Sequence, residues 1–120
     1  MANLRKSPNE HPPLSIPVLQ LLLALSGGDK HGYAIMKEVE RDTQGRTRLG
    51  PGTLYGAIKR LLEQGLIEES GERVDEALDD QRRRYYRLTG RGRQVLRAEL
   101  ERLESLTRQD KARAVLEGAP

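Results

Sequence analysis

The residues whose types and spacing best suit a chemical role lie between positions 49 and 65. Gly52 and Thr53 are small residues at the expected start of a helix, and Lys59 and Arg60 follow further along it. Small residues there let a helix backbone approach base edges in the DNA major groove. The basic side chains can then contact phosphates or guanine edges. An ordinary amphipathic surface helix would carry the same residues, so this stretch alone leaves both interpretations open.

Start and stop signals enclose this predicted helix. Gly50 is the expected N-cap, and Pro51 suits the first helical position, where the missing N–H costs nothing. Gly65 is the expected left-handed stop. One face is apolar at the i, i+4, i+7 and i+8 spacing of a helix, formed by Leu54, Ile58, Leu61 and Leu62. One side of the helix therefore suits a core, and the other is left for a partner.

Composition and charge narrow the class of protein. The chain has 120 residues, which predicts one domain, and only 3% are aromatic, so its core must be aliphatic. The formal net charge of +3 supports an anionic partner only weakly. The local distribution says more, because residues 43–62 contain basic side chains and no acidic one. Clustered basic residues are typical of a surface that binds nucleic acid.

We expect no enzymatic activity, no metal and no cofactor. The sequence has no glycine-rich phosphate loop after a strand, no nucleophile elbow and no metal-binding histidine pair. His11 and His31 each lack an accompanying ligand, and the absence of cysteine excludes disulfides and thiolate metal sites. The apolar run 16–25 is too short to span a bilayer and no signal peptide is evident, so we expect no membrane association and a cytoplasmic location.

The first part of the chain predicts an arm and a buried helix. Residues 1–13 lack apolar periodicity and are expected to form a flexible arm. Ser15 is the expected N-cap of a helix that ends near Leu25. This helix is apolar on nearly all sides, so it lies either at the centre of the domain or in a subunit interface. Leu19 and Leu22 are its candidate contacts with a second subunit.

A second helix and a hairpin flank the central helix. The second helix is expected from about His31 to Thr43, with Asp29 as its cap. After Gly65 the pattern predicts short strands at residues 66–69 and 84–88. The polar stretch 70–81 between them carries Gly71 as a turn residue and an acidic tip. Tyr85 and Tyr86 point to opposite faces of the second strand, so one of them belongs in the core. A hairpin placed after such a helix is called a wing.

Thr89 is the expected N-cap of a long last helix, from about Arg91 to Leu116. Its apolar seam is narrow, with steps of four, three and three residues: Leu96, Leu100, Leu103 and Leu106. A long helix with so narrow a seam has little of its own chain to cover, so we expect it to pair with a second copy. The alternative is that it folds back on its own domain.

Several short motifs in one order resemble a known family. They are His31-Gly32-Tyr33, Gly52-Thr53-Leu54-Tyr55, Gly65-Leu66-Ile67 and Arg84-Tyr85-Tyr86-Arg87-Leu88-Thr89. Together they resemble the PadR family of bacterial transcriptional regulators, in its short form with a single C-terminal helix, over roughly residues 14–108. The resemblance implies a winged helix-turn-helix that dimerises through its terminal helices and usually represses transcription. Gly56 and Gly90-Arg91-Gly92 depart from the residues common in the family.

The resemblance also implies roles for individual residues. It places Thr53 and Tyr55 at the start of the recognition helix, Lys59 on its DNA side, Tyr33 near the DNA backbone and residues 84–87 in the wing. The full set of candidate DNA-binding residues is Tyr33, Gly52, Thr53, Tyr55, Lys59, Arg60, Arg83 and Arg84. Two alternatives remain. The tyrosines could belong to the core, and nearby acidic side chains could neutralise the arginines.

These interpretations give a specific expectation. The fold is mainly α with a small β-hairpin, divided into an arm (1–13), a winged helix-turn-helix (14–89) and a C-terminal dimerisation helix (90–117). We expect a homodimeric, sequence-specific repressor on a near-palindromic double-stranded DNA operator, released by a small-molecule effector between the dimer helices. The chain lacks tryptophan, on which family members that bind flat drugs rely. The competing hypothesis is a winged-helix module for protein contacts that does not bind DNA.

Overall fold

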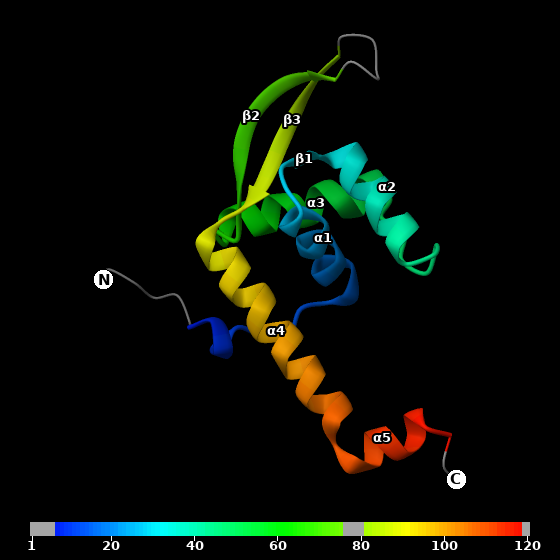
Figure 1. Cartoon of the computed structure of the whole chain (residues 1–120). Helices are drawn as coiled ribbons and strands as arrows, with labels where there is room; N and C mark the ends of the chain where they lie inside the picture. The colour runs from blue at the N-terminus through cyan, green and yellow to red at the C-terminus, as the bar shows by residue number, and fades with distance from the viewer. Residues whose placement is uncertain (1–6, 76–80, 119–120) are drawn as a thin grey trace.

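Three helices, a hairpin and a long helical tail make up the fold. The structure is a computed structural model that describes the backbone of residues 7–75 and 81–118, and the side chains of residues 7–73 and 83–118. Figure 1 shows the hairpin rising from one side of the three-helix unit and the tail leaving from the other. In chain order the described elements are η1 (Pro8–Glu10), α1 (Ile16–Ser26), β1 (Lys30–His31), α2 (Gly32–Asp42), α3 (Pro51–Glu63), β2 (Ile67–Asp75), β3 (Gln81–Leu88), α4 (Gly90–Arg108) and α5 (Asp110–Leu116). The predicted class, mainly α with a small β-hairpin, is confirmed.

An aliphatic core holds α1, α2, α3 and the start of α4 together. Its largest fully buried side chains are Leu21, Leu22, Leu25, Ile35, Leu54, Leu66, Ile67, Val39 and Val95. Leu19, Leu22 and Leu96, which were candidates for contact with a second subunit, are 5%, 0% and 4% exposed within this chain. Their burial inside the chain leaves the outer part of α4 as the more accessible part of the predicted dimer face.

The start of α1 and both ends of α3 follow the expected signals. The Ser15 hydroxyl accepts a hydrogen bond from the Val18 N–H at 3.4 Å at the start of α1. Gly50 is the N-cap of α3, with Pro51 in its first turn, and Gly65 follows the helix with a φ of 72°. Glycine adopts this left-handed backbone without a steric penalty, which explains why the chain turns there.

The sheet is larger than the sequence predicted. β3 lies between β2 and the two-residue strand β1 and runs antiparallel to both. Gly71 was expected at a turn, but it lies within β2 beside a bulge, where the register shifts between Glu69 and Gly71. Its φ of 107° suits that bulge. Tyr86 is the buried tyrosine of the pair on β3, as alternation requires. The predicted acidic tip lies mostly outside the described residues.

The prediction of one unbroken C-terminal helix was wrong. α4 ends at Arg108, Gln109 adopts an extended backbone with ψ of 142°, and α5 begins at Asp110. The apolar seam of α4 ends at Leu106, and polar or charged residues occupy positions 107–111. A helix that continued through residues 107–111 would therefore gain no apolar contact there. No proline or glycine in this segment forces the break at Gln109.

Part of the predicted N-terminal arm packs against α4. Residues 8–10 form a 3-10 turn that contacts α4, and the N–H of Leu14, the residue after the predicted arm, donates to Glu99 Oε2 at 3.3 Å. Arg102 donates to both carboxylate oxygens of Glu99, at 2.7 and 3.1 Å. The hydrogen bonds from Arg102 lower the pKa of Glu99, with burial opposing them and the Leu14 N–H adding to them. This buried carboxylate therefore fastens the arm to α4.

The hairpin and α4 meet at a crowded junction. The Thr89 hydroxyl donates to the Gly65 carbonyl at 2.6 Å, and the Thr89 N–H donates to the Leu66 carbonyl at 3.1 Å. The same hydroxyl accepts from the Gly92 N–H at 2.9 Å and caps α4. A Cβ at Gly92 would overlap the Leu66 carbonyl. The close approach of α4 to the end of α3 thus explains this glycine, which departs from the family pattern.

Replacing Gly92 by alanine should destabilise the protein. The added Cβ has to displace the Leu66 backbone, and such overpacking costs about 1–3 kcal/mol. Urea unfolding followed by circular dichroism measures the loss. Gly90→Ala is the matched control, because a Cβ there has nothing within 4 Å. Equal stability of the two variants would contradict the account of the junction.

Glu99→Gln should reduce stability in a pH-dependent way. The folded pKa of Glu99 is lowered, so its stabilisation is present above the unfolded pKa and is lost as pH falls through the folded value. We expect a loss of about 1–3 kcal/mol near pH 7 and a shrinking difference in acid. Unfolding curves across this pH range test it, with the exposed Glu104→Gln as control. A pH-independent difference would refute the role of the ionised carboxylate.

Candidate nucleic-acid interface

α3 separates its two faces cleanly. Leu54, Ala57, Ile58 and Leu61 are buried on the inner face. The outer face carries Gly52, Thr53, Tyr55, Lys59 and Arg60, all of them exposed. Five of the eight candidate DNA-binding residues therefore lie together on one accessible helix surface. A helix with small residues at its start and cations further along has the shape and charge to enter a major groove.

The ring of Tyr33, at the start of α2, lies near one cation of its own helix and one of β3. Its side chain is 41% exposed. The Lys37 Nζ lies 5.5 Å from the centroid of its ring, and the Arg83 guanidinium carbon from β3 lies 5.9 Å away. Both distances fit cation–π contacts. The structure thus brings two candidates from distant parts of the chain, Tyr33 and Arg83, into one cluster.

Lys37 was missed by the sequence analysis. It is exposed and follows Tyr33 by four residues on α2, so both side chains lie on one face of the helix. That spacing was the available signal. We call Tyr33, Lys37 and Arg83 the aromatic-cation cluster.

Arg84 does not join the aromatic-cation cluster. Successive side chains of β3 alternate between its faces, so Arg84 shares a face with the buried Tyr86 rather than with Arg83. Its guanidinium lies 3.4 Å from a carboxylate oxygen of Glu69 on β2, and both side chains are largely exposed. Arg84 is therefore partly neutralised, although it stays accessible on the hairpin.

Tyr55 has a structural contact as well as an exposed surface. Its side chain is 48% exposed. A Cβ at Gly32 would come within 2.5 Å of the Tyr55 hydroxyl oxygen, so this hydroxyl lies directly against the first turn of α2. A side chain at position 32 would therefore have to displace the Tyr55 ring, which packs the start of α3 against the start of α2.

His31, and not Asp29, caps α2. The His31 Nδ1 accepts a hydrogen bond from the Ala34 N–H at 3.1 Å, and the His31 ring meets the Tyr85 ring edge-on at 5.2 Å. Asp29 instead pairs with Arg73 of β2 at 3.1 Å. The prediction of Asp29 as the cap was therefore wrong. Its carboxylate ties the hairpin to the turn between α1 and α2.

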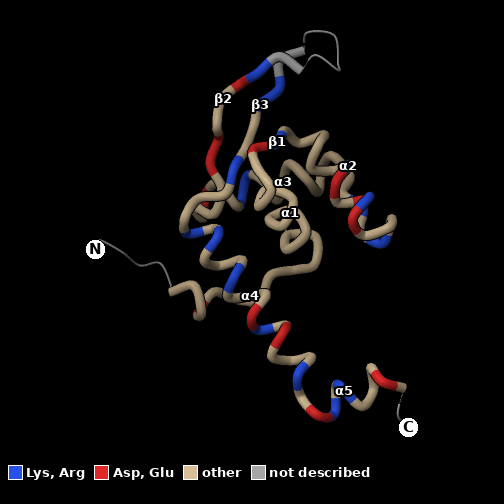
Figure 2. Tube along the Cα trace, viewed as in Figure 1, with Lys and Arg blue, Asp and Glu red and all other residues tan. Residues whose placement is uncertain are grey.

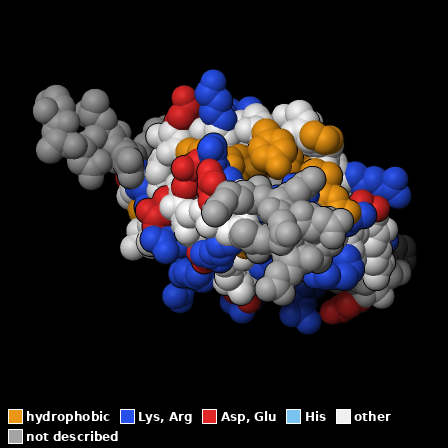
Figure 3. All heavy atoms as spheres, turned by 90° about the horizontal axis from the view of Figure 1, so that it is seen from above, with side chains coloured by type: hydrophobic (Ala, Val, Ile, Leu, Met, Phe, Trp, Pro, Cys, Tyr) orange, Lys and Arg blue, Asp and Glu red, His pale blue; other side chains and the backbone are white. Residues whose placement is uncertain are grey.

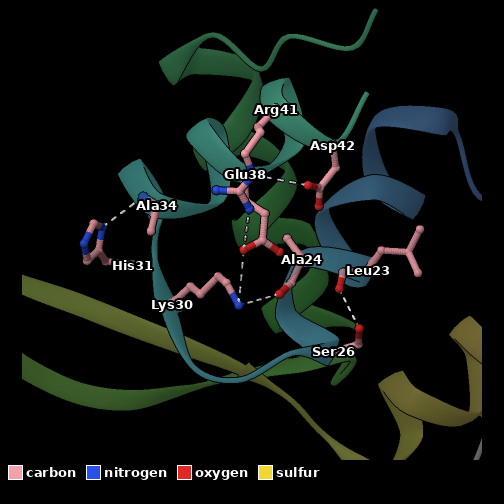
Figure 4. A network of polar contacts seen from close by, with 9 residues as sticks. All are labelled: Leu23, Ala24, Ser26, Lys30, His31, Ala34, Glu38, Arg41 and Asp42. Carbon is pink, nitrogen blue, oxygen red and sulfur yellow. Dashed lines mark hydrogen bonds and ion pairs between the residues drawn. The ribbon is translucent and has the colours of Figure 1, made fainter. Parts of the chain in front are cut away.

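A small polar network fixes α2 on α1. The Lys30 Nζ donates to the Ala24 carbonyl at 2.8 Å and lies 3.6 Å from the Glu38 carboxylate. Figure 4 shows Lys30 between the end of α1 and the middle of α2, with Arg41 continuing the network through Glu38. Because Lys30 and Glu38 have mostly covered side chains, this bridge orients α2 more firmly than an exposed ion pair would.

Charged side chains of both signs lie at both ends of the molecule. In Figure 2, acidic and basic residues alternate along the outer part of α4 and α5. In Figure 3, the end seen from above has hydrophobic side chains, a class that includes tyrosine, close to lysine and arginine. The aromatic-cation cluster brings a tyrosine hydroxyl and two cations together, a combination that suits contacts with sugar and phosphate.

The described residues show neither a metal-binding cluster nor a membrane-spanning helix. They contain no group of three or more His, Cys, Asp or Glu side chains placed to hold a metal ion. None of their helices is long and apolar enough to cross a bilayer.

Comparisons with known proteins agree on one family. The sequence model described as "Transcriptional regulator PadR-like family" matches residues 21–98. The transcriptional regulator YqjI of Escherichia coli is 36% identical over 100 residues, which cover 81% of this chain. The chain spans only 44% of the length of that relative.

Solved structures share the fold. A transcriptional regulator from Clostridium thermocellum superposes with a TM-score of 0.63 and 30% identity, over 75% of this chain and 82% of its own. Bacillus subtilis PadR, solved in complex with operator DNA, gives a TM-score of 0.61 at 20% identity, over 82% of this chain and 50% of its own. At that identity the second likeness concerns the fold alone.

His31→Ala should destabilise α2 because it removes the acceptor for the Ala34 N–H. Loss of an N-cap typically costs about 1 kcal/mol. His31→Asn retains an acceptor of suitable reach and should recover part of the loss. Thermal and urea unfolding of both variants measure the difference. If the alanine and asparagine variants were equally stable, capping by His31 would be wrong.

Proposed function

The chain belongs to the PadR-like family of transcriptional regulators, and from that premise we propose that it binds double-stranded operator DNA as a homodimer. The observation that carries the proposal is the outer face of α3, which is exposed, small at its start and basic further along. Such a protein would act on chromosomal DNA in the cytoplasm.

In this proposal α3 is the recognition helix. Gly52 and Thr53 allow the first turn to approach base edges, and Tyr55 lies at the rim of the groove. Lys59 and Arg60 are placed to contact guanine edges or the phosphates that border them. Support comes from the exposure of all five side chains and from the burial of the opposite face of α3.

The aromatic-cation cluster would hold the DNA backbone beside α3. Tyr33 can donate its hydroxyl to a phosphate, and Lys37 and Arg83 add positive charge near its ring. Arg84, already paired with Glu69, would make a weaker wing contact. Most of the affinity would then be electrostatic and salt-dependent.

A twofold partner would set the spacing of the two recognition helices. On α4, Leu100 and Leu106 are 39% and 49% exposed, and Leu103 is only partly covered. These leucines form the proposed dimer face, because the remaining candidates are buried in the chain itself. Two major-groove helices on one side of the duplex lie about 34 Å apart, which predicts a near-palindromic operator.

We further propose that DNA binding represses transcription and that a small molecule bound between the dimer helices releases it. A change in the crossing of the two α4 helices would alter the separation of the two α3 helices. Operator DNA bound to Bacillus subtilis PadR supports a DNA-binding role for this fold. Absence of tryptophan in this chain argues against the stacking of a flat drug.

A gel-shift titration at moderate salt tests the proposal as a whole. Its probe is the DNA upstream of the gene that encodes this protein. We expect a retarded band, and an excess of random DNA should displace the labelled probe only poorly. A purified chain that ignores double-stranded DNA even in dilute buffer would instead favour a module for protein contacts.

Lys59→Ala should weaken operator binding by about 1–3 kcal/mol if Lys59 contacts a base. Lys111→Ala on α5 is the matched control, because it removes the same exposed charge at the far end of the tail. The control should bind nearly as well as the unaltered chain. An unchanged affinity for Lys59→Ala would remove this lysine from the interface.

Lys37→Ala should reduce the salt dependence of binding. A lysine that neutralises one phosphate contributes about one unit to the slope of log affinity against log salt, so a dimer should lose about two units. Affinity measured at several salt concentrations gives the slope, and the loss should be similar for operator and random DNA. A slope equal to that of the unaltered protein would contradict a phosphate contact at Lys37.

A further inference from the structure

We infer that the ion pair between Asp29 and Arg73 holds the hairpin in the orientation that brings Arg83 to the DNA backbone. We call this ion pair the hairpin lock. The inference rests on the proposed DNA binding, and it makes Asp29 and Arg73 positioning residues for the aromatic-cation cluster. Two observations carry it. The pair joins the hairpin to the turn before α2, and Arg73 lies directly opposite Arg83 in the sheet.

The short strand β1 holds only the base of the hairpin. β1 has two residues, and they pair with Tyr85 and Tyr86 of β3. β2 and β3 continue beyond this point, where Arg73 lies opposite Arg83. Figure 1 shows this outer part of the hairpin rising past β1. A two-stranded ribbon is only marginally stable by itself, so contacts with the helical unit have to fix its orientation.

The hairpin lock supplies such a contact. Arg73 Nη2 donates to Asp29 Oδ2 at 3.1 Å. The Asp29 side chain is 29% exposed and the Arg73 side chain 47%, so neither is fully surrounded by water. Asp29 belongs to the turn between α1 and α2, whereas Arg73 lies on β2 beyond the bulge at Gly71. The ion pair therefore joins two segments that are distant in the sequence.

The Arg73 guanidinium has a second partner on the same face of the hairpin. Its carbon lies 4.4 Å from the centroid of the Tyr85 ring, which fits a cation–π contact. The residue opposite Tyr85 is Gly71, which has no side chain, so the ring is accessible to its diagonal neighbour Arg73. The Tyr85 ring in turn meets the ring of His31, the N-cap of α2. The hairpin lock is thereby connected to the start of α2.

Asp29 also offsets a repulsion within the hairpin. Arg73 and Arg83 are direct cross-strand neighbours, and like charges in such a pair repel each other. The Asp29 carboxylate neutralises Arg73, and the guanidinium carbon of Arg83 lies 5.9 Å from the Tyr33 ring. The two arginines thus contact different parts of the helical unit. Loss of the Asp29 charge would restore the repulsion and weaken the placement of Arg83 beside Tyr33.

Two physical effects of Asp29→Asn on DNA binding have opposite signs. An acid beside a phosphate-binding cluster repels DNA, so neutralising it should strengthen binding if Asp29 has no other role. If Asp29 holds the hairpin, its neutralisation lowers the fraction of molecules with a docked hairpin, and the affinity falls with that fraction. A hairpin that is docked about half of the time costs each subunit about twofold and a dimer about fourfold.

Operator titrations of full-length variants test the inference. Asp29→Asn and Arg73→Gln should each weaken binding by about fourfold. The double variant should bind no more weakly than either single one, because both substitutions remove the same ion pair. Asp29→Glu keeps a carboxylate and should recover most of the affinity. Asp42→Asn is the matched control, since it neutralises an exposed acid at the end of α2 whose partner, Arg41, is its neighbour in the chain. It should not weaken binding.

The salt dependence of binding distinguishes positioning from a direct contact. A positioning residue leaves the bound complex unchanged, so the slope of log affinity against log salt should be the same for Arg73→Gln as for the unaltered protein. A phosphate contact by Arg73 would instead reduce the slope by about two units in a dimer.

Amide hydrogen exchange measured by NMR tests the hairpin lock without DNA. In Asp29→Asn and Arg73→Gln, exchange at residues 30–34 should become about two- to fivefold faster, because the ion pair no longer holds β1 and the start of α2 against the hairpin. Amides in the middle of α3 should exchange at their original rates, which excludes a general loss of stability.

The outcomes separate this inference from the proposed function. Equal or tighter operator binding by Asp29→Asn, or a reduced salt slope for Arg73→Gln, would overturn the positioning role and leave DNA binding intact. Unchanged exchange at residues 30–34 would overturn the hairpin lock itself. If the unaltered protein ignores operator DNA while exchange rises in the variants, the proposed function is wrong, and the ion pair holds the hairpin without serving DNA binding.

Discussion

The orientation of α3 is the constraint on which the rest of the structure depends. Leu54, Ile58 and Leu61 are at most 2% exposed, and burial of each such side chain is worth about 1.5–3 kcal/mol. Turning the helix over would expose these residues and bury Lys59 and Arg60 without partners, at a large cost. The aliphatic core therefore fixes which face of α3 meets solvent, and that face carries the proposed DNA contacts.

Other elements connect this face to the two ends of the molecule. Tyr55 against Gly32 holds the start of α3 to α2, and the aromatic-cation cluster joins α2 to the hairpin. At the other end of α3, the hydrogen bonds of Thr89 and the close approach of Gly92 to Leu66 join α4 to the same unit. A change in how two α4 helices cross would thus be transmitted to α3 through packed backbone rather than through a flexible linker.

Local signals in the sequence predicted the helices, because their caps act within a few residues. Ser15, Gly50 and Thr89 each cap the expected helix. The errors have long-range causes. Asp29 was expected to cap α2, but it pairs with Arg73, which is distant in the sequence. His31 is the N-cap instead. β1 and the docking of residues 8–14 on α4 likewise depend on tertiary contacts. Helical spacing in the sequence predicted that the candidate residues of α3 share one face. It could not predict that Tyr33 and Arg83 lie close together, because that proximity depends on how α2 and β3 pack in the folded chain.

Protection of operator guanines from methylation at N7 is the most direct test of the central claim, because N7 lies in the major groove. The account predicts two protected patches on one side of the duplex, about one helical turn apart, in a near-palindrome. Protection confined to the minor groove, or a single patch without a twofold mate, would contradict the placement of two α3 helices by a symmetric dimer.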